Sequence, residues 1–192
     1  SSITVARDKN VILDMDGHTL NFTQQLVNNG TLQIVDNSAS KNGMLSTSTV
    51  TLLVNSGTMT IDDIKLHNGS GNNTIYNTGT LNFNGEIESS GRGIETKGTL
   101  NVNGDIEAVT YGLYVNGGTT TINGGTITST GTNYEAVALY GYGGSITIND
   151  GYILGKNKIA VRTSVNTTIN GGSIESEKEE GIGEAWGPTS AV

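Results

Sequence analysis

The chain has 192 residues, no cysteine and a formal net charge of −8, and 28 of its residues are glycine. The length fits one domain, the lack of cysteine excludes disulfides and thiolate-bound zinc, and the acidic balance excludes nucleic acid as a partner, because phosphates require a basic surface. No run of 18 apolar residues is present, so we expect no membrane insertion.

Residues 1–28 are expected to form an N-terminal cap and the first coil of a repeat, because VILDMDG at residues 11–17 is the first of eight similar segments. Later copies read GTLQIVD, GTMTIDD, GTLNFNG, GTLNVNG, GTTTINGG, GSITINDG and NTTINGG. The apolar anchors of the eight copies lie 19 to 27 residues apart, and they are Met15, Ile34, Ile61, Phe83, Val102, Ile122, Ile148 and Ile169. A period of about 22 residues with variable insertions is typical of a solenoid.

Within each coil the apolar residues alternate with polar ones, which is the period of a strand and not of a helix. Leu100 and Val102, for example, alternate with Asn101 and Asn103. Asn-Gly and similar turn signals separate about three such runs in each coil. The sequence therefore predicts an all-β fold, a right-handed parallel β-helix (β-solenoid) of about eight coils with three short strands per coil. We expect one domain over residues 1–187 and a tail or linker over residues 188–192.

The residue after each anchor forms a polar column, which consists of Asp16, Val35, Asp62, Asn84, Asn103, Asn123, Asn149 and Asn170. Amide side chains that stack in register can bond from coil to coil, as asparagine ladders do in other stacked β structures. We therefore expect an amide ladder at this corner of the coil.

These repeats resemble right-handed parallel β-helices of the pectate-lyase-like class. The opening segment ITVARDKNVILDMDGHTL at residues 3–20 resembles the first coil of β-helical regions in large bacterial surface proteins. The resemblance implies an extracellular location, at a bacterial cell surface or secreted, within a longer multidomain chain. It implies no single function, because this fold carries lyases, hydrolases, adhesins and stalks.

Four carboxylates are expected on one face of two neighbouring coils: Glu86 and Glu88 on one coil, and Asp105 and Glu107 on the next. In-register coils would place the two pairs about 4.8 Å apart. Oxygen ligands of this kind suit Ca²⁺, and Asp63 extends the cluster if its coil is aligned with a one-residue gap. The alternative is a solvated acidic face without metal.

A second face is expected on the third strand of each coil, where Tyr114, Tyr140 and Arg162 point outward and Tyr111, Tyr134 and Tyr142 lie in adjacent loops. Tyrosine rings stack on the C–H faces of sugars, and their hydroxyls form hydrogen bonds. Ala138 and Ala160, expected to point outward, would leave a shallow trough beside Tyr140. The alternative is ordinary tyrosine on a β surface.

Other sequence signals are weaker. Residues 36–50 and 128–136 lengthen two coils, and such loops carry function or reflect drift. The threonines at 119–121 and 126–130 resemble those of ice-binding surfaces, but their spacing is not sustained over enough coils to favour that function. No nucleophile elbow and no phosphate-binding loop is present, so no catalytic residue is assigned.

We therefore expect a non-enzymatic extracellular module that acts as an adhesin or carbohydrate-binding β-helix. Its partner would be a host or environmental glycan or a surface protein, and it would require no cofactor, with Ca²⁺ as the one open alternative. Two other functions stay open: a polysaccharide lyase or glycoside hydrolase that uses the acidic face, and a structural stalk without ligand. The resemblance implies that a lyase would use Ca²⁺ with a nearby Lys or Arg base, and Arg92 and Lys97 lie on the neighbouring segment.

Overall fold

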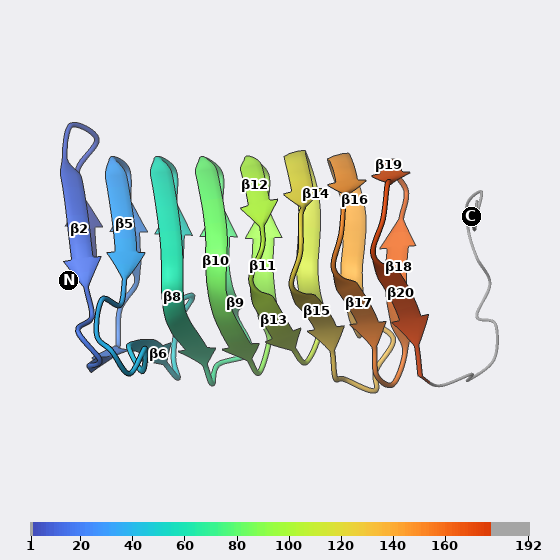
Figure 1. Cartoon of the computed structure of the whole chain (residues 1–192), viewed down its shortest axis with the longest axis horizontal. Helices are drawn as coiled ribbons and strands as arrows, with labels where there is room; N and C mark the ends of the chain where they lie inside the picture. The colour runs from blue at the N-terminus through green and yellow to red at the C-terminus, as the bar shows by residue number, and fades with distance from the viewer. Residues whose placement is uncertain (1, 178–192) are drawn as a thin grey trace.

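A computed structural model describes residues 2–177, which form a parallel β-solenoid of about eight coils (Figure 1). The described residues contain strands and no helix, and each strand pairs in parallel with strands of the neighbouring coils. The all-β parallel β-helix with three strands per coil is therefore confirmed. The predictions for residues 178–187 and for the tail at 188–192 lie outside the described residues.

Each coil supplies strands to three sheets, and four long strands turn a corner and serve two sheets: β8 (Thr58–Asn68), β10 (Thr80–Ser89), β14 (Tyr111–Ile122) and β16 (Val137–Ile148). The first sheet contains β2 (Asn10–Asp14), β5 (Thr31–Val35), the first halves of β8 and β10, β12 (Thr99–Val102), the second halves of β14 and β16, and β19 (Asn166–Ile169).

The second sheet contains β3 (Thr19–Phe22), β6 (Met44–Thr47), the second halves of β8 and β10, β13 (Asp105–Ala108), β15 (Thr126–Ser129), β17 (Tyr152–Gly155) and β20 (Ser173–Ser176). The third sheet contains β1 (Ile3–Val5), β4 (Leu26–Asn28), β7 (Leu53–Asn55), β9 (Asn73–Asn77), β11 (Arg92–Thr96), the first halves of β14 and β16, and β18 (Ile159–Thr163). β1, β2 and β3 therefore form the first coil.

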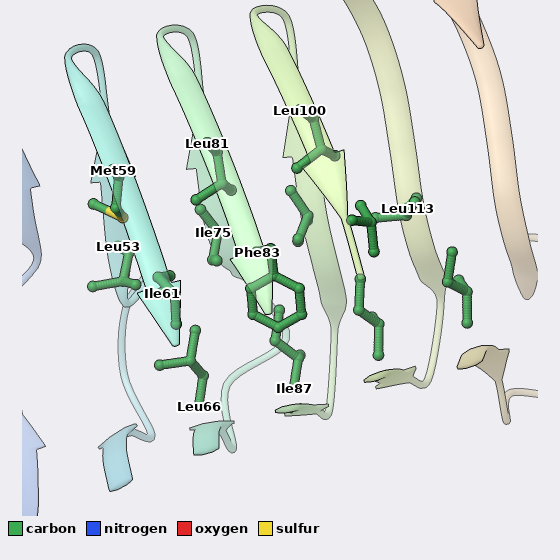
Figure 2. Close-up of a cluster of buried hydrophobic side chains, with 14 of the residues drawn as sticks. Leu53, Met59, Ile61, Leu66, Ile75, Leu81, Phe83, Ile87, Leu100 and Leu113 are labelled. Atoms are coloured by element: carbon green, nitrogen blue, oxygen red, sulfur yellow. The ribbon is translucent and has the colours of Figure 1, made fainter. Parts of the chain in front are cut away.

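The core is a narrow column of apolar side chains between the three sheets (Figure 2). Met59, Leu81 and Leu100 stack in register from coil to coil, and all three are fully buried. Phe83 is the largest fully buried side chain, and Gly104 leaves room for its ring, because a Cβ at Gly104 would come within 2.9 Å of Phe83 Cε1. The inward half of the alternation thus forms the continuous apolar core.

The first anchor of the repeat is Leu13 and not Met15. Leu13 pairs with Ile34, and Asp14 rather than Asp16 pairs with Val35. Asp16 lies beyond the end of β2 with a φ of 45°, in a turn with Gly17 at 75°. The prediction that Met15 is the first anchor failed because VILDMDG aligns with the later copies two residues earlier than its similarity to them suggests.

The predicted amide ladder forms in two separate runs, because no side-chain hydrogen bond joins Asn103 to Asn123 and Val35 has no amide. Asn84 donates to Asp62 at 2.6 Å, Asn103 donates to Asn84 at 2.7 Å, Asn149 donates to Asn123 at 2.8 Å and Asn170 donates to Asn149 at 2.8 Å. All four donors are exposed to solvent, so water competes with these bonds.

A second amide ladder, which the sequence reasoning missed, lies inside the solenoid at the end of the third sheet. Asn28 donates to Asn55 Oδ1 at 2.8 Å, Asn55 donates to Asn77 Oδ1 at 2.8 Å and Asn77 donates to Thr96 Oγ1 at 3.0 Å. All four residues are fully buried. The signal was the recurring LVN, LVN and IYN before each turn.

The segment at 36–50 is not a simple insertion, because it contains β6, which pairs with β3 and β8. Asp36 holds its loop: the carboxylate accepts hydrogen bonds from the backbone N–H groups of Gly17, Ser38 and Gly43. Burial opposes its charge, but these hydrogen bonds outweigh burial and place the pKa of Asp36 well below its usual range.

Candidate functional site

The third sheet carries a continuous patch of tyrosine rings on its outer face. Tyr114 pairs with Tyr140 on the next coil, and their rings stack with centroids 5.2 Å apart and planes 12° apart. Tyr111 lies 5.2 Å from Tyr140 and 5.4 Å from Tyr114, and Tyr142 lies 6.3 Å from Tyr140. We call Tyr111, Tyr114, Tyr140 and Tyr142 the tyrosine face.

The register of the parallel strands creates this face. Tyr76, Glu95, Tyr114, Tyr140 and Arg162 occupy one outward column on five successive coils. Strands in a sheet lie about 4.8 Å apart, so rings in one column meet at stacking distance. Rings already in contact lose little rotamer freedom when a ligand binds, which makes the face a preformed platform.

Two arginines flank the tyrosine face. Arg92 Cζ lies 5.4 Å from the Tyr111 ring centroid and 5.7 Å from that of Tyr114, while Arg162 Cζ lies 6.0 Å from that of Tyr140. These distances allow cation–π attraction, which holds both guanidinium groups against the rings. Arg92 also pairs with Glu95 at 3.3 Å, whereas Arg162 forms no ion pair with any residue between 2 and 177.

Glu95 is the polar centre beside the rings, and its side chain is only 12% exposed. Its carboxylate accepts hydrogen bonds from Asn73 Nδ2 at 3.0 Å and from Asn116 Nδ2 at 3.4 Å, in addition to the bond from Arg92. Burial, followed by the charge of Glu95, raises the pKa of the Tyr114 phenol. The phenol therefore stays a hydrogen-bond donor at neutral pH.

The structure brings together most but not all of the predicted tyrosine residues. The prediction that Tyr111 and Tyr142 lie in loops is wrong, because they belong to β14 and β16, and Tyr111 is buried with only 8% exposure. Tyr134 is 79% exposed in the loop between β15 and β16, and it makes no ring contact with the described residues. The predicted trough is wrong, because Ala138 and Ala160 are buried in the core, 0% and 3% exposed.

A local change in strand alternation explains that error. Gly112, next to Ala138 on the neighbouring coil, also faces inward, since a Cβ there would come within 2.7 Å of Ile127 Cγ2. Sequence reasoning also missed Arg92 and Asn73 as partners of the face. The strand register could have revealed these partners, because it places Glu95 beside Tyr114 and therefore places the residues that contact Glu95 near the rings.

The predicted acidic cluster forms on the outer face of the second sheet, where Glu86 pairs with Asp105 and Glu88 with Glu107. The four residues line a shallow depression together with Thr126 and Thr128. Among residues 2–177, no three carboxylate or imidazole groups converge in a way that could hold a metal ion. The calcium site itself stays a prediction.

Two lysines that the sequence reasoning missed pair with three of the four carboxylates and offset half of the cluster's formal charge. Lys65 Nζ lies 3.1 Å from Glu86 and 2.9 Å from Glu88, and Lys156 Nζ lies 3.2 Å from Glu107. His67 Nδ1 also lies 3.6 Å from Glu88. All these side chains are substantially exposed, so the ion pairs contribute little to stability. They do reduce the repulsion between the carboxylates, and with it the tendency of the cluster to bind a cation.

The prediction that Asp63 extends the acidic cluster is wrong. Lys65, not Asp63, lies opposite Glu86, because β8 contains one extra residue at its corner. Asp63 adopts a φ of 54° at this bulge, and its carboxylate pairs with Lys41 at 3.1 Å. The cluster therefore does not extend to Asp63.

Neither basic residue considered for a lyase, Arg92 or Lys97, lies on the acidic face. Arg92 lies on the third sheet, and Lys97 follows β11 with its ammonium 5.9 Å from the Tyr76 ring, so neither lies on the second sheet. Hydrogen bonds to Glu88 and Glu86 raise the pKa of Lys65. A raised pKa keeps Lys65 protonated, which is opposite to what a general base needs.

Searches of protein-family models, of curated proteins and of solved structures found no match to this chain. In residues 2–177 no helix has the length and apolar character that spanning a bilayer requires.

Proposed function

We propose that this chain is a non-enzymatic carbohydrate-binding module and that the tyrosine face is its binding surface. One observation carries the proposal: the stacked rings of Tyr114 and Tyr140, with the buried Tyr111 ring packed against both, form a preformed aromatic platform beside a polar network centred on Glu95. Stacking on the rings fits the apolar faces of pyranose sugars, and the surrounding amide and guanidinium groups suit their hydroxyls.

The module would act outside the cell, on a bacterial surface protein of the pectate-lyase-like β-helix kind, as the repeat resemblance implies. An open platform buries little of its ligand, so each contact would be weak. Useful affinity would then come from several modules or several sugar units acting together.

Glycan-array binding followed by calorimetry tests this proposal. Tyr140→Ala should abolish retention, because Tyr140 contacts every other ring of the face. Tyr134→Ala is the matched control, since it removes an equally large ring that is 79% exposed and outside the patch. Tyr140→Phe keeps the ring stack but removes the hydroxyl, so it distinguishes the contribution of the ring to binding from that of the hydroxyl.

Retention of glycan by Tyr140→Ala at the wild-type level would contradict the proposal, provided that both proteins melt at similar temperatures. Binding of no glycan at all by the wild type would also contradict it and would favour the stalk. Release of unsaturated sugars from an acidic polysaccharide in the presence of Ca²⁺ would favour the lyase instead.

A further inference from the structure

The outer face of the first sheet is a regular array of threonine and asparagine side chains. One column contains Thr31, Thr58, Thr80, Thr99, Thr119, Ser145 and Asn166. A second column, two residues further along each strand, contains Gln33, Thr60, Asn82, Asn101, Thr121, Thr147 and Thr168. Together with Asn84, Asn103, Asn123, Asn149 and Asn170 of the exposed amide ladder, these columns form what we call the polar array.

The expectation that threonine spacing is not sustained is therefore wrong. Threonine occupies one column on five successive coils, and serine follows on the sixth. The pattern is hidden in the sequence, because loops of different length separate the coils. The threonines at 126–130 do not belong to this array, since β15 lies in the second sheet.

The polar array differs in charge and chemistry from the rest of the molecule. Its columns contain no charged and no aromatic side chain, although the chain carries a net charge of −8; Asp62 adjoins it at one corner, where Asn84 donates to it. The array therefore offers no charge to an ionic mineral surface and no ring to stack on the apolar face of a sugar. The chemistry of the array suits a neutral partner that both donates and accepts hydrogen bonds.

The array is also rigid before any partner arrives. Threonine is β-branched and stiff at χ1, so its hydroxyl and methyl groups have few alternative positions. Asn101 donates to Asn82 at 2.8 Å, and the exposed ladder fixes the third column in the same way. An amide that donates one N–H group to its neighbour in this way still has a second N–H group to offer a partner.

We propose that the polar array binds ice. Its side chains repeat about every 4.8 Å along the solenoid and about every 6.7 Å along the strands, which gives a two-dimensional lattice. Water at an ice surface is neutral, donates and accepts hydrogen bonds and repeats in two dimensions on a similar scale. A preordered array with this repeat therefore meets many lattice positions at once, with little loss of side-chain entropy.

Partition of the purified protein into slowly growing ice, together with thermal hysteresis, tests this proposal. We expect the wild-type protein to enter the ice and to show hysteresis. Thr99→Lys places a long charged side chain in the middle of the array, at an exposed position, and should abolish both effects. Thr132→Lys makes the same change at an exposed loop residue between β15 and β16 and should retain both.

Melting curves by circular dichroism must show that both variants fold like the wild type. Exclusion of the wild type from ice would refute the proposal, and so would equal hysteresis in Thr99→Lys and Thr132→Lys. Binding to crystalline cellulose or chitin that Thr99→Lys abolishes, without any effect on ice, would assign the array to a polysaccharide and would likewise refute it. The tyrosine face is unaltered in both variants, so its glycan binding is tested independently.

Discussion

Replacing Asn55 by alanine measures how far the buried amide ladder stabilises the solenoid. Asn55 is fully buried, and its Nδ2 donates to Asn77 Oδ1 at 2.8 Å and to the Thr80 carbonyl at 2.9 Å. Its Oδ1 accepts a hydrogen bond from Asn28 at 2.8 Å. Alanine removes all of these bonds at once, and no solvent reaches the site to replace them.

The expected loss of stability follows from those contacts. Each lost hydrogen bond is worth about 0.5–1.5 kcal/mol, and a buried acceptor left without a donor adds about 1–3 kcal/mol. Because these contributions overlap, we expect Asn55→Ala to lower the free energy of unfolding by about 3–5 kcal/mol. In a chain of this length that corresponds to a fall of roughly 6–20 °C in Tm.

Asn103→Ala is the matched control, because Asn103 makes the same kind of bond, at 2.7 Å to Asn84, on the exposed ladder. Water can replace that bond, so we expect a change of less than about 0.5 kcal/mol. Urea unfolding followed by circular dichroism measures both variants, and the slope of the transition shows whether the coils still unfold together. Equal losses in the two variants would refute the argument that burial makes the inner ladder important.

Three further predictions follow from single contacts. Thr120 is fully buried in a column with Leu100 and Ile146, and its hydroxyl has no hydrogen-bond partner. Thr120→Val should therefore raise the free energy of unfolding by about 1–3 kcal/mol, whereas the control Thr121→Val, at an outward position, should leave it unchanged. A lower free energy of unfolding in Thr120→Val would disprove this. The ion pair between Lys65 and Glu88 lowers the pKa of Glu88 and raises the pKa of Lys65. The contribution of this pair to the free energy of unfolding is therefore complete between the usual pKa values of the two groups. It is lost as the pH falls through the folded-state pKa of Glu88 or rises through that of Lys65. Lys65→Met should therefore melt below the wild type near neutral pH but together with it once Glu88 is protonated, and a gap that persists in acid would contradict this. Because Lys65 and Lys156 already pair with Glu86, Glu88 and Glu107, millimolar Ca²⁺ should leave the Tm unchanged, whereas a rise that Glu86→Gln removes would establish the calcium site.

The fold was predictable because every coil repeats the same local sequence pattern. Inward positions alternate with outward ones, and turn residues recur at each corner, so period and composition alone define a stacked parallel solenoid. The exceptions lie at the corners. Asp16 and Asp63 both adopt positive φ there, and one such residue moves the apparent register by one or two positions without changing the motif.

The candidate sites were predictable only as far as register could be inferred. Glu86 and Asp105 lie in segments of equal length, and the sequence aligns them correctly. Lys65 and Lys156 belong to coils with an extra residue or a longer loop, and sequence spacing therefore separates them from the carboxylates they neutralise. Ala138 was placed on the wrong face because strict alternation fails at the start of β16, where Val137, Ala138 and Leu139 are all buried.

The three faces of the solenoid differ because only its interior is constrained by packing. Inward residues must fill a narrow core at close to crystalline density, so changes there are costly. An outward column contacts mainly its own neighbours, and most surface substitutions change stability by less than about 0.5 kcal/mol. Each sheet can therefore acquire its own chemistry: neutral hydroxyls and amides on the first, paired charges on the second and aromatic rings on the third. Since the core separates these faces, a substitution such as Tyr140→Ala on one should leave the chemistry of the other two unchanged.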